Sequence, residues 1–236
     1  MSTLLPDASG AEKSLAATLA DLARDLQREQ VPDDVMVHSV HSAVALVPGA
    51  QEASISLVRS RRHVLSAAVT SDVARGFDAV QGELGEGPCL AAIASEPVVR
   101  ADDLAGDPRW PRLGARAGEL GVRSMLCFQL FVHENTLGAL NLLSAEASAF
   151  DEEAETVGAM VAAHAAVALA GAQKFDHLRT ALANRDVIGQ AKGILMERFK
   201  VDADRAFDLL TRASQDRNVK LHRLAVELTR TGSLER

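Results

Sequence analysis

The strongest constraint on this chain is a helical pattern without proline that begins at Asp151 and runs to Phe199. Proline removes a backbone donor and clashes with the preceding turn, so its absence lets one helix continue through the whole stretch. The weak points of the pattern are four glycines, Gly158, Gly171, Gly189 and Gly193. The chain is thereby divided into a first part that contains strands and a second part that is helical.

Short apolar and β-branched segments in the first part predict five strands. They lie at residues 53–59, 64–70, 98–101, 124–132 and 137–144, and the last two favour a hairpin around residues 133–136. Helical composition is found at 12–29, 33–46, 71–79 and 88–95. Strands and helices mixed in this way predict an α+β domain, with an antiparallel sheet flanked by helices.

Two narrow apolar seams have the three-four spacing of helices that pair with other helices. The first seam consists of Leu15, Leu19, Leu22 and Leu26, and the second of Phe175, Leu178 and Leu182. We therefore assign residues 1–32 to an N-terminal dimerisation helix. The protein is expected to be a homodimer.

Two further helices are predicted after Val201. Asp202 is expected to cap the start of the first and Asn218 the start of the second, which ends before Gly232. Their apolar positions and those of the long helix are expected to close one small core, made of Ile188, Ala191, Leu195, Phe199, Ala206, Phe207, Leu210, Ala213, Leu221, Leu224, Ala225 and Leu228.

The charge is distributed unevenly along the chain. Of the net charge of −7, residues 1–175 carry −10 and residues 176–236 carry +3, so only the C-terminal part favours a polyanion. The two cysteines are too few for a disulfide framework or a multi-cysteine zinc site, and the N-terminus lacks the features of an export signal. The apolar stretch 157–172 is short for a membrane span. We expect a cytoplasmic protein without a cofactor, a metal or membrane contact.

The segment from Ile188 to Met196 is the most informative one. Gly189 and Gly193 lie four residues apart in a helical pattern, and each costs about 1 kcal/mol relative to alanine. A helix that keeps both needs a close approach there, either by another helix or by a nucleic-acid backbone. Lys192 lies beside this surface, and Arg185 lies on the same face, seven residues earlier.

A second basic group lies at the start of the last predicted helix and consists of Arg217, Lys220 and Arg223. The expectation is that the two basic groups form one surface. The alternative is that they are ordinary solvated charges, because this part of the chain also carries nine acidic residues.

The region from Arg179 to Arg230 resembles the ANTAR family. The resemblance rests on Arg185, Ile188–Met196, Ala206–Leu210, Ala213–Gln215, Asn218–Leu221 and Leu224–Ala225, in family order and spacing. It implies a three-helix module that binds nascent RNA as a dimer, recognises paired stem-loops with six-nucleotide loops and prevents transcription termination. The RNA-binding residues predicted here are Arg185, Gln190, Lys192, Gly193, Arg217, Lys220 and Arg223.

Residues 33–172 resemble a GAF domain. The resemblance rests on Gly85–Ala92, on Asp107–Pro111 with Leu120–Ser124, and on Leu137–Leu142 followed by Phe150–Asp151. It implies a central antiparallel sheet with a pocket on one face, used for small ligands, redox groups or protein contacts. The cyclic-nucleotide subgroup has an asparagine–lysine pair, whereas Asn141 is followed here by Leu142, which argues against nucleotide binding.

Together these features predict three parts: an N-terminal helix (1–32), a GAF-like sensory domain (33–172) and an ANTAR RNA-binding module (173–236). The expected function is that of a signal-responsive RNA-binding regulator, not an enzyme. A small ligand or an upstream signalling partner at the GAF domain is expected to act on the RNA-binding module through the connecting helix.

Two other functions stay open. Cys89 follows Pro88 in a first helical turn, where helix-end amides favour a thiolate, and with Cys127 it would suit a thiol-dependent reductase of the GAF fold. The other interpretation is that both cysteines are buried apolar side chains. The three short helices, with a basic last one, would also suit a DNA-binding regulator.

Overall fold

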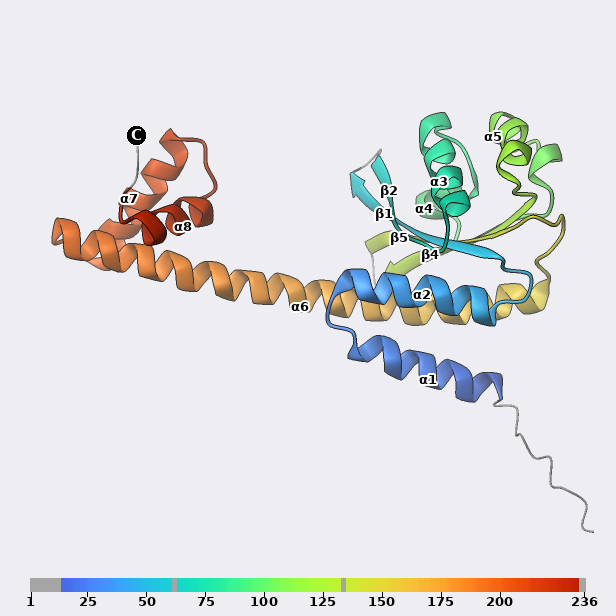
Figure 1. Cartoon of the computed structure of the whole chain (residues 1–236), viewed down its shortest axis with the longest axis horizontal. Helices are drawn as coiled ribbons and strands as arrows, with labels where there is room; N and C mark the ends of the chain where they lie inside the picture. Colours follow the sequence, from blue (N-terminus) through green and yellow to red (C-terminus); the bar gives the residue numbers. More distant parts are fainter. Residues whose placement is uncertain (1–13, 61–62, 133–134, 234–236) are drawn as a thin grey trace, which may run out of the picture. The chain divides into compact units, whose positions relative to one another are not determined.

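The chain forms two compact units, residues 1–173 and 174–236. A computed structural model describes residues 14–60, 63–132 and 135–233. Helix α6, Glu152–Phe199, runs without a break from the first unit into the second (Figure 1). Asp151 caps this helix, since its Oδ1 accepts a hydrogen bond from the Ala154 amide at 2.9 Å. The long helix predicted from the sequence is confirmed.

The first unit is built on a five-stranded antiparallel sheet with the order β2-β1-β5-β4-β3. Its strands are β1 Glu52–Ser60, β2 His63–Val69, β3 Val98–Ala101, β4 Ser124–Val132 and β5 Asn135–Ser144. The predicted strands and the pairing of the last two are confirmed, and residues 133–134 of the expected turn lie outside the described residues. The α+β prediction therefore holds.

Helices cover both faces of this sheet (Figure 1). One face packs against α2, Pro32–Leu46, and the first part of α6. The other face packs against α3 Asp72–Leu84, α4 Pro88–Ala94 and α5 Pro111–Ala117. Short 3-10 turns, η1 Leu104–Gly106 and η2 Gly118–Leu120, lie before and after α5. The sheet thus separates two hydrophobic cores, one on each face.

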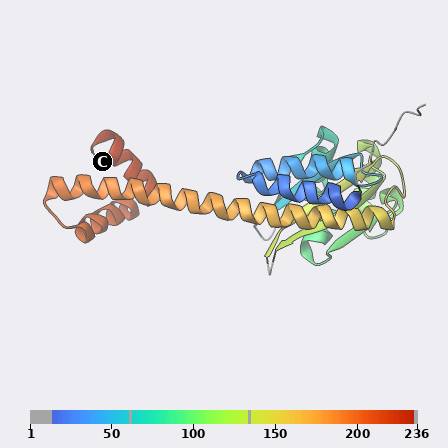
Figure 2. The ribbon, with the colours of Figure 1, turned by 90° about the horizontal axis from the view of Figure 1, so that it is seen from below.

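Helix α1, Leu15–Arg28, lies beside α2 (Figure 2). Its Leu19, Leu22 and Leu26 are buried in the core that α2, the sheet and α6 share. The leucine seam that we expected to face a second copy is therefore packed within one chain, and only Leu15 at its start is exposed. A dimerisation role for residues 1–32 needs other side chains and stays a prediction; residues 1–13 lie outside the described part.

The first part of α6 is a core helix. Gly158 lets it approach the sheet, because a Cβ added there would lie 2.4 Å from ring atoms of Phe128 on β4. Among the described residues, α6 alone is long and apolar enough by length and composition to cross a membrane. Half of its most apolar window is buried inside the protein, as expected for a helix that packs on a sheet.

The second unit is a three-helix module. The end of α6 packs with α7, Ala203–Asp216, and α8, Leu221–Thr231. Asp202 caps α7 as predicted, since its Oδ1 accepts a hydrogen bond from the Arg205 amide at 2.8 Å. The buried core consists of Ala191, Leu195, Ala206, Leu210, Leu224, Ala225 and Leu228.

Three details of this module differ from the sequence-based prediction. Asn218 does not cap α8: it adopts a left-handed conformation with φ +50°, and the helix starts after Lys220 without a side-chain cap. Phe199 and Phe207 were expected in the core, but 57% and 41% of their surfaces are exposed. The core between the end of α6 and the short helices α7 and α8 is small, so alanine and leucine fill it and both aromatic rings remain outside.

A matched pair of glycine variants tests the packing of α6. Gly158→Ala should lower the free energy of unfolding by about 1–3 kcal/mol, because the Phe128 ring is buried and cannot move away. Gly171→Ala, on the same helix, should raise it by up to about 1 kcal/mol, because its Cβ meets nothing within 4 Å. Chemical denaturation of the two variants measures both changes. Equal effects would contradict this packing.

Candidate functional site

Two of the four glycines of α6, Gly189 and Gly193, point away from the core of the second unit. Ala191 and Leu195 are buried, whereas Gly189 and Gly193 lie on the exposed side of the same turns. A Cβ added at either glycine meets nothing within 4 Å. The interpretation that another helix of the same module packs on these glycines therefore does not apply.

Lys192 and Arg185 lie on one flank of this exposed face. The Nζ of Lys192 lies 5.7 Å from the centre of the Phe207 ring on α7, within the range of a cation–π contact. Arg185 is exposed two helical turns earlier. The exposed ring of Phe207 thus extends the basic flank of α6 by an apolar surface.

Gln190 and Gly193 line a groove between α6 and α8. The groove is completed by Ile194, Glu197 and Arg198 of α6 and by Thr229 of α8. A guanidinium nitrogen of Arg198 also donates a hydrogen bond to the carbonyl oxygen of Gly232, which fixes the end of α8 against α6.

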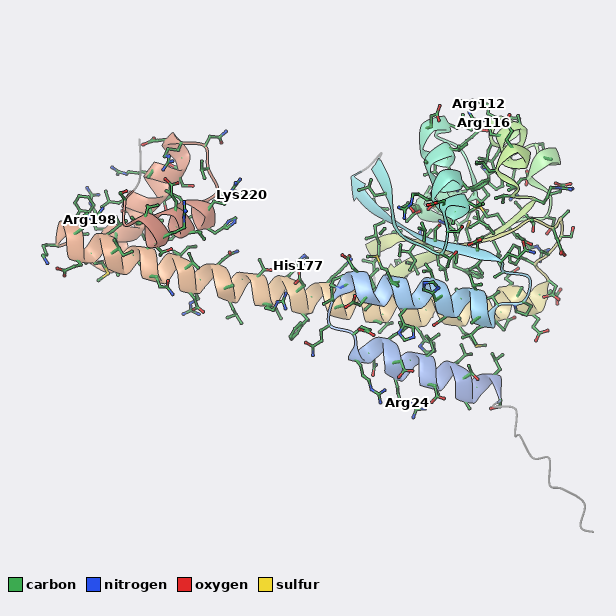
Figure 3. The ribbon with its side chains drawn as sticks, in the orientation of Figure 1. Arg24, Arg112, Arg116, His177, Arg198 and Lys220 are labelled. Carbon is green, nitrogen blue, oxygen red and sulfur yellow. The ribbon has the colours of Figure 1, made fainter. Side chains whose placement is uncertain are left out.

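The second basic group lies at the corner between α7 and α8. Arg217 is paired with Glu227, with 3.3 Å between the guanidinium and the carboxylate. Lys220 is exposed at the start of α8, and Figure 3 shows it at the opposite end of the module from Arg198. Arg223 lines a groove on the outer face of α8, together with Val219, Val226, Glu227, Arg230 and Thr231.

The two predicted basic groups do not share a groove among the described residues. Arg185, Gln190, Lys192 and Gly193 belong to α6, whereas Lys220 and Arg223 belong to the outer side of α8 and Arg217 is occupied by Glu227. The structure adds Arg230, which lines the same groove as Arg223. The seven-residue spacing of these arginines would have placed both on one helix face, and this signal was missed.

The first unit contains a buried group of polar side chains between the sheet and helices α3 and α4. This polar cluster consists of Ser54, Ser56, Ser66, Asp78, Gln81 and Asn141. Asn141 Nδ2 lies 3.0 Å from Ser54 Oγ, 3.3 Å from Ser56 Oγ and 3.4 Å from Asp78 Oδ1. Ser56 Oγ donates to Asp78 Oδ2 at 3.1 Å. Burial raises the pKa of Asp78, and its hydrogen bonds to serine and asparagine only partly offset this.

The two cysteines are buried beside the polar cluster. Burial and the neighbouring Asp78 raise the pKa of Cys89 to about 12, and burial raises that of Cys127 well above its ordinary value. Loss of solvation outweighs the helix-end amides of the short helix α4. Both cysteines are therefore thiols at neutral pH, and the reactive-thiolate interpretation of Cys89 is not supported.

Trp110, which directly precedes α5, is buried, with the Arg109 guanidinium 4.1 Å from the centre of its ring, and so anchors its loop. Within residues 14–60, 63–132 and 135–233, no three histidine, cysteine, aspartate or glutamate side chains are grouped so that they could hold a metal ion.

Comparison with protein families assigns both units. A GAF domain model matches residues 29–170, and an ANTAR domain model matches residues 176–228. The chain belongs to the GAF family and carries an ANTAR domain. This architecture is that of an RNA-binding antitermination regulator with a GAF sensor domain. A search of curated proteins gives no match.

Solved structures show the same fold at low sequence identity. The GAF domain of a phosphoenolpyruvate-protein phosphotransferase from Coxiella burnetii is 18% identical, with a TM-score of 0.54 over 68% of this chain and 95% of that one. Free methionine-R-sulfoxide reductase from Neisseria meningitidis is 16% identical, with a TM-score of 0.55 over 70% and 95%. The phytochrome photosensory core module of Stigmatella aurantiaca is 12% identical, with a TM-score of 0.60 over 90% and 46%. At these identities the likeness concerns the fold alone.

Alanine at the exposed glycines of the ANTAR domain tests whether the module itself needs them. Gly189→Ala and Gly193→Ala should each raise the free energy of unfolding by about 0.5–1 kcal/mol, since helix propensity improves and nothing clashes. Gly232→Ala, at the left-handed end of α8 with φ +71°, should lower it by about 1 kcal/mol. Thermal unfolding measures all three. A loss of stability at Gly189 or Gly193 would show that the fold requires them.

Proposed function

We propose that this GAF–ANTAR protein is a signal-responsive regulator that binds paired stem-loops in nascent RNA and prevents transcription termination. The observation that carries the proposal is the bare face at Gly189 and Gly193. These glycines weaken α6 and serve no contact inside the ANTAR domain, so their role lies outside the module. Lys192 and Arg185 supply positive charge beside this face, where an RNA backbone can come close to the helix.

The proposed RNA surface has two parts. The first is the α6 face with Arg185, Gln190, Lys192 and Gly193, where Phe207 adds an apolar edge. The second is the corner and outer side of α8 with Arg217, Lys220 and Arg223, which we extend to Arg230 because it shares the groove of Arg223. Lys192 and Arg185 lie where the RNA backbone would come close to α6. Lys220, Arg223 and Arg230 offer exposed positive charge for further phosphate contacts, whereas Arg217 would first have to leave its salt bridge with Glu227.

A homodimer fits the recognition of two RNA loops. Phe175, Leu178 and Leu182 of α6 are 47%, 57% and 62% exposed, which is unusual for three apolar side chains at three-four spacing. We propose that a second copy of the chain covers them. The dimer would then present two ANTAR domains to a pair of loops.

The remaining assignments complete the proposal. Residues 33–172 act as the sensory domain and 173–236 as the RNA-binding module, and the protein works in the cytoplasm, where nascent transcripts are made. A ligand or signalling partner at the GAF domain changes RNA binding through α6 only if it favours one arrangement of that helix over another. A reductase function is disfavoured by the raised pKa of Cys89.

RNA binding is tested by competition. The full chain should bind an RNA with two six-nucleotide hairpin loops more tightly than duplex DNA of equal length at one fixed salt concentration. Lys192→Ala or Arg185→Ala should weaken RNA binding by about 1–3 kcal/mol, roughly 5- to 150-fold, if the side chain reads a base. Arg212→Ala, which removes an exposed arginine from α7, is the matched control and should change little.

Gly193→Leu sharpens this test. A Cβ added at Gly193 meets nothing within 4 Å, so the fold should survive while the leucine side chain blocks the RNA approach. Fluorescence anisotropy with labelled RNA gives the affinities, and circular dichroism confirms folding. Full RNA affinity in folded Lys192→Ala, Arg185→Ala and Gly193→Leu would place the RNA site elsewhere, and preference for DNA would favour the DNA-binding alternative.

The dimer is tested by light scattering at micromolar concentration. The wild-type chain should show twice its mass of 25.0 kDa. Leu182→Lys should give monomers, because it places a charge in the proposed seam. Thr180→Lys, an exposed position on the opposite side of the same helix, should leave the dimer intact. A monomeric wild type, with and without RNA, would exclude this seam as an interface.

A further inference from the structure

The polar cluster of the GAF domain contains side chains that its own packing leaves incompletely satisfied. Gln81 and Asn141 are 1% and 0% exposed, yet among the described residues neither Gln81 Nε2 nor Asn141 Oδ1 has a hydrogen-bond partner, and Ser66 Oγ also lacks one. Gln81 uses only its Oε1, which accepts a hydrogen bond from the Cys89 amide at 3.0 Å. Buried polar atoms are nearly always paired in folded proteins, so two unpaired amide atoms beside one carboxylate call for an explanation.

The charge of the cluster restricts what can bind there. Asp78 contributes the carboxylate. Ser56 and Asn141 donate hydrogen bonds to it, Ser54 and Ser66 lie close by, and none of these neighbours carries a charge. The other ionisable groups that face it are the thiols of Cys89 and Cys127. A phosphate or carboxylate would be repelled by Asp78, whereas a cation would gain a counter-ion in a region of low dielectric.

We propose that this cluster is a ligand site for a small organic cation with several N–H donors, of the ammonium or amidinium class. Asp78 is its counter-ion, Asn141 Oδ1 accepts a second N–H, and Gln81 Nε2 is left to donate to an acceptor elsewhere on the ligand. This inference rests on the proposed sensor role of the GAF domain and names the chemistry of its signal.

Strand β5 connects this site to α6 within the first unit. Asn141 points to the side of α3 and α4, whereas its neighbours Leu140 and Leu142 are buried in the core that contains α6. Because Gln81 and Asn141 are buried, a ligand enters only when α3, α4 or the strand shifts. The same shift changes the packing of Leu140 and Leu142 against the core of α6.

The inference is tested on the full chain with two probes, acetamidinium chloride and methylammonium chloride. At about ten times the dissociation constant, either probe should raise the unfolding midpoint by about 3 °C, whereas sodium chloride and sodium acetate at equal ionic strength should not. Asp78→Asn should abolish the response. Asp72→Asn, which removes an exposed carboxylate from the same helix, should keep it.

The outcomes separate this inference from the proposed function. No response to either probe, or an equal response in Asp78→Asn, overturns the cation site. If Asp78→Asn does not fold, Asn141→Ala, which removes the second proposed acceptor, replaces it, and an unchanged response in this variant, or a response to acetate, overturns the cation site. RNA affinity is measured in the same samples: loss of the cation response with intact RNA binding leaves the proposed function standing, whereas absence of RNA binding removes the proposed function itself.

Discussion

One continuous helix belongs to two hydrophobic cores. The first part of α6 is buried against the sheet of the GAF domain, and its end supplies Ala191 and Leu195 to the core of the ANTAR domain. Backbone hydrogen bonds run unbroken through its 48 residues. A helix keeps a fixed rotation per residue, so in each unit the periodic apolar positions of α6 face that unit's own core. Phe175, Leu178 and Leu182 belong to none of the three hydrophobic cores of the described residues, and the proposed dimer depends on them.

The glycines of α6 have different surroundings along the helix. At Gly158 the missing side chain brings the helix against the Phe128 ring, so this glycine is structural. At Gly189 and Gly193 the missing side chains leave open surface, and this is the surface that we propose for RNA. Glycine costs similar helix propensity in both places, and only the surroundings distinguish packing from recognition.

Local patterns in the sequence predicted the architecture well. The five strands, the long helix and the cap at Asp202 depend on hydrophobic period, absence of proline and local hydrogen bonding, all of which act over a few residues. The failures have nonlocal causes. Leu19, Leu22 and Leu26 have the pattern of a helix seam, but the pattern does not state whether its partner is the same chain or another. Phe207 was misplaced because the capacity of a small core depends on all three helices.

In the candidate sites, too, local features could be predicted from the sequence and nonlocal ones could not. The basic residues of the ANTAR domain and the helices that carry them were predicted from sequence, but whether the two groups share a surface depends on how the helices pack. The polar cluster could not be predicted, because strand pairing and the packing of α3 bring together Ser54, Asp78 and Asn141 from distant parts of the chain. For Cys89, the helix-end position was visible, but burial decides its pKa.

The central claim is that the protein acts on termination through paired RNA loops, and transcription itself is the most direct readout. Single-round transcription would be run on two templates with the same terminator, one preceded by a pair of six-nucleotide hairpin loops that overlaps it and one without the loops. The account predicts that the full chain increases readthrough on the first template only. Equal readthrough on both templates, at protein concentrations that saturate RNA binding, would contradict it.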